Sequence, residues 1–180
     1  PRDAFPMIPR FLAVLVLAVP LPAQAHLASV RMGPFHGGLL HPLTALEHLL
    51  EFLALGLLFG LQARDRAALG ALAFAAALGA GATIAIGLQA EPRPGPLVSG
   101  SLALTGALVA LARPLGTAWI AGIAVAFGLV HGFENGAAVV RAEDAVPYVL
   151  GVATAGYVAV ALAAAAVRAP GSGRRVLVAY

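Results

Sequence analysis

The chain has 180 residues, of which 61% are hydrophobic and 11% are charged, and its formal net charge at pH 7 is +3. A water-soluble domain carries about a quarter charged residues, so this composition indicates an integral membrane protein with one small helical domain. Cysteine is absent, which excludes disulfides, thiolate metal sites and cysteine catalysis. All 11 basic residues are arginines near the ends of apolar segments, so membrane topology explains the positive charge better than nucleic acid does.

The first 25 residues have the features of a secretory signal peptide. Arg10 precedes a short apolar run from Phe11 to Val19, and residues 23–25 (Ala-Gln-Ala) match an A-x-A cleavage signal. Cleavage would make His26 the N-terminal residue. The alternative is an extra N-terminal helix, against which the shortness of the apolar run argues.

Five further apolar segments follow, each about 16–22 residues long, near the ~20 residues that cross a bilayer as a helix. They are continuous apolar runs, and only helices or closed barrels satisfy their backbone in lipid. We therefore predict an all-α fold, a polytopic bundle of five transmembrane helices, or six if the signal is uncleaved. We expect one transmembrane domain over 26–168 and a cytoplasmic tail over 169–180. The predicted helical segments are 42–62, 67–88, 97–112, 115–131 and 146–167.

The charges between these segments predict the orientation of the chain. The positive-inside rule places one set of arginines in the cytoplasm: Arg64, Arg66, Arg113, Arg168, Arg174 and Arg175. On the other side acids dilute the arginines: Arg31, Glu91, Arg93, Glu134, Arg141, Glu143 and Asp144. A cleaved signal independently places the mature N-terminus outside, and five spans then place the C-terminus inside.

A cluster of ionisable groups opens the first of these segments. The run from His36 to Glu51 reads H-G-G-L-L-H-P-L-T-A-L-E-H-L-L-E and brings to membrane depth His41, Glu47, His48 and Glu51. Such groups are costly in lipid and are normally kept for ion paths, ligands or relays. Imidazole and carboxylate together suit a divalent transition metal.

Helical geometry limits which of these groups can act together. His41 and His48 are about 10 Å apart along a straight helix, so they cannot hold one ion unless Pro42 distorts the first turn. His48 and Glu51 can share a face. His131, on the fourth segment, returns to the same outer level and could complete their set.

The remaining candidates lie near the ends of segments. Glu134 follows His131 by one turn if the helix continues, although Gly132 and Gly136 suggest that it unwinds there. His26 and His36 precede the first mature helix, and an N-terminal His26 could chelate through its amine and ring.

Structural interpretations compete with these functional ones. A lone histidine at a helix end is often only interfacial, and Glu47 could merely hydrogen-bond Thr44 or a neighbouring helix. Trp119 and Tyr148 are expected to be interfacial anchors or packing residues. Small residues predict close helix packing without a site: Gly79, Gly81, Ala82, Gly87, Gly100, Ser101, Thr105, Gly106, Gly151, Thr154 and Gly156.

An enzyme is not expected. Ser99 and Ser101 have no histidine on their segment, and there is neither a phosphate-binding loop nor an H-E-x-x-H motif. A metal-activated water would be the remaining route to hydrolysis, but nothing identifies a substrate.

The residues from His41 to Leu50, H-P-L-T-A-L-E-H-L-L, resemble the signature H-P-x-x-G-x-D-H-x-L of the HupE/UreJ family. Members are small membrane proteins associated with hydrogenase and urease gene sets and regarded as nickel or cobalt permeases. The resemblance also covers Ala25-His26, the P-L-V run at 96–98, F-G-L-V-H-G at 127–132 and P-Y-V-L-G at 147–151.

The chain departs from the family pattern at several places. Ala45 stands for a glycine, Glu47 for an aspartate and Asn135 for a second histidine. Ser99 replaces a frequent glutamate, and Val160 a histidine late in the last helix. Glu51 and Glu134 are extra acids that could compensate.

The resemblance implies a permease of a bacterial inner membrane that takes nickel or cobalt from the periplasm. His26 and His36 would capture the ion, and His41, Glu47, His48 and His131 would form the entry site. Neutral imidazole binds metal, so binding would weaken below about pH 6. The metal is substrate, no organic cofactor is expected, and the partners are the lipid bilayer and other membrane subunits or further copies, not nucleic acid. The alternative is a non-transporting subunit that packs against a larger membrane complex.

Overall fold

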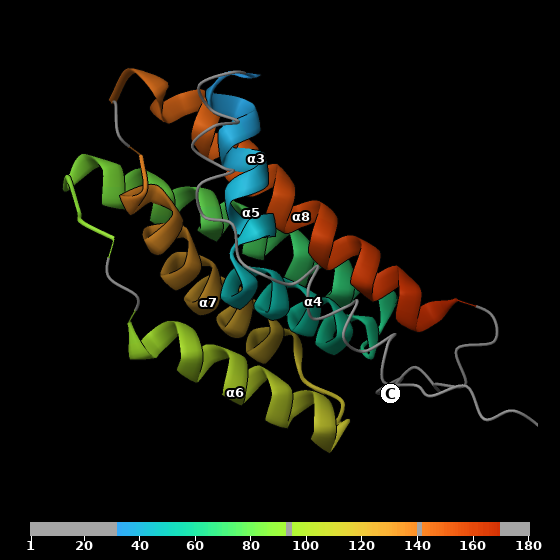
Figure 1. Ribbon diagram of the computed structural model, residues 1–180. Helices are drawn as coiled ribbons and strands as arrows, with labels where there is room; N and C mark the ends of the chain where they lie inside the picture. The colour runs from blue at the N-terminus through green and yellow to red at the C-terminus, as the bar shows by residue number, and fades with distance from the viewer. Residues whose placement is uncertain (1–31, 93–94, 140–141, 170–180) are drawn as a thin grey trace, which may run out of the picture.

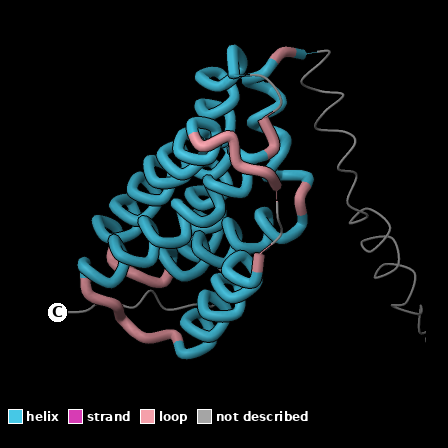
Figure 2. The backbone as a smooth tube through the Cα atoms, turned by 90° about the vertical axis from the view of Figure 1, so that its left-hand side faces the viewer, coloured by secondary structure: helices cyan, strands magenta, loops and turns pink. Residues whose placement is uncertain are grey.

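The computed structural model describes residues 32–92, 95–139 and 142–169. Within them the chain forms only helices and loops, which confirms the all-α prediction (Figure 1, Figure 2). The predicted signal peptide, His26 and residues 170–180 lie outside the described residues. The elements are α3 (Pro34–Thr44), α4 (Leu46–Gly60), α5 (Arg64–Gly87), α6 (Pro96–Leu111), α7 (Thr117–Ala137), the 3₁₀ helix η1 (Ala142–Asp144) and α8 (Ala145–Arg168).

The helices form a bundle of the kind that crosses a membrane several times. α5, α7 and α8 are each long and apolar enough to span it, and α3 and α4 qualify together although they bend by 79° at their junction. α6 has 16 residues and is about 24 Å long, less than the ~30 Å hydrocarbon core. The count of five complete spans therefore stays a prediction.

Two expectations about helix continuity were wrong. The first predicted segment, 42–62, is broken at Ala45 into two helices. The fourth does not unwind at Gly132 and Gly136, because α7 continues to Ala137.

The glycines of α7 serve close packing. Gly128, Gly132 and Gly136 recur every fourth residue on the side that faces α5, and a Cβ on each would overlap backbone carbonyl oxygens of Phe74, Leu78 and Ala82 respectively. Small residues let two backbones approach in this way. Gly38 of α3 and Gly56 of α4 allow the same close approach to α8.

The predicted packing role of the small residues is confirmed for some and wrong for others. Buried examples are Gly81, Ala82, Ser101, Thr105, Gly151 and Gly156. Gly87, Gly100 and Gly106 are exposed, and a Cβ there would meet nothing within 4 Å. These three glycines therefore lie on the outer surface of the bundle.

α6 lies at the edge of the bundle, beside α4 and α7 (Figure 1). Its buried side consists of Val98, Ser101 and Thr105, while its opposite side is exposed. Two hydroxyl groups therefore enter the interior from an edge helix.

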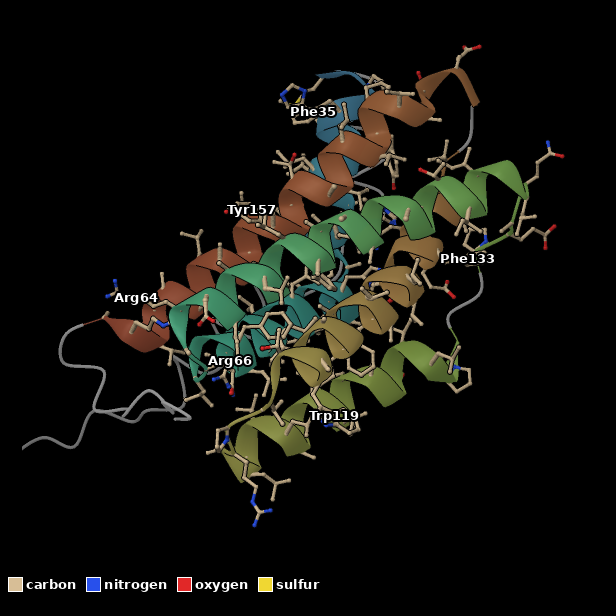
Figure 3. The ribbon with its side chains drawn as sticks, turned by 180° about the vertical axis from the view of Figure 1, so that it is seen from behind. Phe35, Arg64, Arg66, Trp119, Phe133 and Tyr157 are labelled. Atoms are coloured by element: carbon tan, nitrogen blue, oxygen red, sulfur yellow. The ribbon has the colours of Figure 1, made fainter. Side chains whose placement is uncertain are left out.

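One end of the bundle is held by side chains that bond to backbone carbonyls. Arg66 Nη1 donates to the carbonyl of Leu115 at 2.8 Å, and Arg168 Nη2 donates to that of Gln62 at 2.6 Å. Gln62 Oε1 in turn accepts the N–H of Leu115 at 2.9 Å. Arg64 and Arg66 lie toward this end, and Phe133 lies toward the other (Figure 3). Among the arginines predicted on the cytoplasmic side, Arg64, Arg66 and Arg168 thus share one end of the molecule, while Arg174 and Arg175 lie outside the described residues.

The two aromatic residues expected at interfaces differ. Trp119 is 71% exposed, as an anchor would be. Tyr148 is buried, and its hydroxyl donates to the carbonyl of Asn135 at 3.0 Å, so it is a packing residue.

Candidate metal-binding site

The site begins at the break between α3 and α4. Ala45 is extended, with φ −87° and ψ 111°, so the helix cannot continue through it. The last turn of α3 remains hydrogen-bonded: the N–H of Ala45 donates to the carbonyl of His41 at 3.1 Å, and Thr44 Oγ1 lies within hydrogen-bond distance of the carbonyls of Leu40 (3.0 Å) and His41 (3.1 Å). Thr44 therefore bonds back to the preceding turn of α3, rather than pairing with Glu47.

This break changes the relation between His41 and His48. On a straight helix their rings would be about two turns apart. With the 79° bend between them, both line a single cavity. The sequence suggested that a helix distortion at Pro42 could bring the two histidines together. The distortion occurs three residues later, at Ala45.

The cavity has a volume of about 790 Å³ and is bounded by three parts of the chain. The broken helix supplies two histidines and a carboxylate, the α5–α6 connection and the start of α6 supply a second wall, and the end of α7 supplies the third. Its lining residues are His41, Ala45, Glu47, His48, Pro92, Gly95, Pro96, Val98, Ser99, Glu134, Ala137, Ala138 and Val139.

His48 joins the cavity to a second, deeper histidine. Its Nδ1 lies 2.8 Å from Nδ1 of His131, with the two rings nearly perpendicular at 75°. His131 is 0% exposed and His48 is 5% exposed. Both rings pack against Phe52, which is also fully buried. The structure brings His48 and His131 together across facing helices, whereas Glu51, the third member of the predicted set, bonds Thr105.

Hydrogen bonds assign the protons of this pair. The hydroxyl of Ser101 donates its single proton to the carbonyl of Val98 at 2.8 Å, so it accepts from His131 Nε2–H at 2.9 Å. In the neutral ring, Nδ1 of His131 is then an acceptor, and His48 Nδ1–H donates to it. Nε2 of His48 keeps its lone pair and makes no hydrogen bond within the described residues.

Glu51 lies one turn further along α4 and has a different partner. Thr105 Oγ1 donates to its Oε1 at 2.7 Å, and both residues are 0% exposed. Glu51 does not line the cavity. Its hydrogen-bond partner is therefore Thr105 rather than a histidine, although it lies on the same face of α4 as His48.

The other predicted ligands are distributed unevenly. His41, Glu47 and Glu134 line the cavity. His36 is exposed and donates from Nδ1 to the carbonyl of Met32 at 2.8 Å, outside the cavity. Among the described residues no three His, Asp or Glu side chains are close enough together to hold a metal ion. The complete predicted ligand set thus stays a prediction.

Three polar residues of the site were missed from the sequence. The sequence predicts Ser101 and Thr105 only as packing residues, and Ser101 has no histidine on its own segment. Asn135 was noted only as a replacement, yet it is fully buried and its Nδ2 donates to the carbonyl of His131 at 2.7 Å. The available signal was the four-residue spacing of two hydroxyls on a short apolar segment, which puts them on one face.

A sequence model of the HupE / UreJ protein family matches residues 13–178. The chain belongs to this family. HupE/UreJ proteins are associated with nickel or cobalt transport or with urease and hydrogenase maturation, and they are not known as catalysts. No curated protein and no solved structure matches the chain.

Proposed function

We propose that this HupE/UreJ protein is a permease for a divalent transition metal, with nickel as the first candidate and cobalt as the second. The observation that carries the proposal is the buried His48–His131 pair, of which His48 lines a cavity that is also lined by His41, Glu47 and Glu134. Imidazole nitrogens are good ligands for these metals. With the arginine-rich end of the molecule in the cytoplasm, as the positive-inside rule predicts, the cavity opens to the periplasm of a bacterial inner membrane.

A metal ion can replace the proton that lies between Nδ1 of His48 and Nδ1 of His131. Two imidazoles that bind one ion at about 2.0–2.1 Å each need nitrogens roughly 3.0–3.4 Å apart, so the 2.8 Å separation has to open only slightly. The displaced proton has an acceptor in Nε2 of His48. His131 Nε2–H continues to donate to Ser101, the kind of outer bond that orients metal-bound histidines.

The cavity walls supply the further ligands. His41, Glu47 and Glu134 line the same space, and a carboxylate offsets part of the charge of an entering dication. Glu47 also lies in the first turn of α4, where the helix dipole favours a negative group. We leave His36 out of the entry site because its exposed ring does not line the cavity.

Equilibrium titration of the purified protein with Ni²⁺ tests the proposal. Loss of an outer partner of a metal-bound histidine costs about 10–100-fold in affinity. We expect the double variant His48→Ala/His131→Ala, which loses both buried ligands, to bind more weakly than wild type by at least the upper end of this range. His36→Ala is the matched control and should bind as wild type does. Equal affinity in the double variant and wild type would rule out the histidine pair as the site.

A second candidate function is that of a non-transporting membrane subunit. It is favoured by the finding that, in the described part of the chain, no three ionisable ligands converge on one point. Purification in fixed stoichiometry with a larger membrane complex would support this candidate. Uptake of Ni²⁺ by liposomes that contain only this protein would exclude it.

A further inference from the structure

Glu51 is a fully buried carboxyl group that the histidine site does not use. Its Oε1 accepts from Thr105, but its Oε2 is buried without a hydrogen-bond partner among the described residues. Nearly all buried polar atoms in folded proteins are partnered. Oε2 of Glu51 therefore has its acceptor capacity available for a further hydrogen bond or for a cation.

The position of Glu51 relates it to the histidine pair. His48 and Glu51 are three residues apart on α4, so they share a face and are separated by about 4.5 Å along the axis. On α6, Ser101 and Thr105 are four residues apart and follow the same order: Ser101 bonds His131, and Thr105 bonds Glu51. The interior between these helices thus holds two polar layers, one turn apart.

Beyond Glu51 this face of α4 becomes apolar. Leu55 and Leu58 continue the helical spacing and are 0% and 1% exposed. The next polar group on the face is Gln62, about 16 Å from Glu51 along the axis, and its amide bonds backbone atoms of the connection between α6 and α7. The ionisable groups on this face of α4 therefore extend from the cavity to Glu51, and the buried leucines Leu55 and Leu58 follow it.

We propose that Glu51 and Thr105 form a second, inner metal station that receives the divalent ion from the histidine pair. This inference rests on the proposed permease function and assigns the next step of the path. Oε2 of Glu51 is the ligand, and Thr105 positions the carboxylate by holding Oε1. The ion passes from two neutral nitrogens to an anionic oxygen, which offsets its charge where the surroundings are apolar.

The variant Glu51→Gln separates the inner station from the outer one. Glutamine keeps the shape and can still accept from Thr105, but it removes the anionic oxygen. We expect Ni²⁺ uptake into proteoliposomes to fall by about tenfold or more, while Ni²⁺ affinity of the histidine pair stays within about threefold of wild type. Glu143→Gln, at an exposed carboxylate of η1, is the matched control and should match wild type in both measurements.

The outcomes distinguish this inference from the proposed function. Wild-type uptake by Glu51→Gln would overturn the inner station and leave the histidine site intact. A folded wild-type protein that binds no Ni²⁺ would instead overturn the permease proposal itself. Retained Ni²⁺ binding reports that Glu51→Gln has folded. If it has not, Thr105→Val serves as the second variant: it should also lower uptake, and unchanged uptake would overturn the role of the pair.

Discussion

At the scale of single residues, the site depends on a hydroxyl that carries no charge. Ser101 fixes which nitrogen of His131 holds the proton, and His131 in turn fixes the proton of His48. The sequence alone identified both histidines, since ionisable groups stand out in apolar segments. It did not identify Ser101, because a serine in a membrane helix looks the same whether it packs or bonds a partner from another helix.

The substitution Ser101→Ala tests this role. It leaves the buried Nε2–H of His131 without an acceptor, so the ring loses its fixed tautomer. We expect Ni²⁺ affinity to fall by about tenfold, the lower end of the effect of removing an outer partner of a metal-bound histidine. Thr154→Ala, at an exposed position of α8 that does not line the cavity, should leave the affinity unchanged. Equal affinities for the two variants in a titration would contradict the assignment.

At the scale of elements, apolar length predicted the helices but not their interruptions. α5 and α8 begin and end within a few residues of the predicted segments, because long apolar runs leave the backbone no alternative in lipid. The break at Ala45 was not predicted, since alanine favours helix. In the structure α3 and α4 both pack on α8, one on each side of the break. The prediction that α7 unwinds at Gly132 and Gly136 was wrong because glycine has two common uses in helices. It can end a helix, or it can let a neighbouring helix approach closely, as α5 does here.

Replacing a packing glycine should therefore destabilise the bundle. A Cβ at Gly132 would overlap the carbonyl of Leu78, which can move only if α5 and α7 separate. We expect Gly132→Ala to lower the free energy of unfolding by about 1–3 kcal/mol. Gly106→Ala has open space around it and should be neutral or stabilising by up to about 1 kcal/mol. Thermal unfolding in detergent, followed by circular dichroism, compares the two; a Gly132→Ala protein as stable as Gly106→Ala would argue against the close α5–α7 contact.

At the scale of the whole molecule, the two ends differ in chemistry. One end carries arginines that bond backbone carbonyls, and the other carries the cavity with its histidines and carboxylates. Composition and loop charge were enough to predict this polarity. They could not predict the cavity, because its walls come from three separate parts of the chain whose approach depends on the break at Ala45.

The orientation can be tested directly because the chain has no cysteine. Glu143→Cys lies near the cavity end and Asp65→Cys at the start of α5, and both positions are exposed. In right-side-out spheroplasts we expect a membrane-impermeant maleimide to label Glu143→Cys at once and Asp65→Cys only after permeabilisation. The reverse pattern would place the cavity on the cytoplasmic side.

The central claim is that a divalent metal ion binds between His48 and His131. X-ray absorption at the nickel edge of the Ni²⁺-loaded protein tests it most directly, because imidazole rings give a distinct outer-shell scattering. We predict at least two imidazole ligands in wild type and in His36→Ala, and one fewer in His131→Ala. A nickel site with only oxygen ligands, or the same number of imidazoles in His131→Ala as in wild type, would contradict the claim.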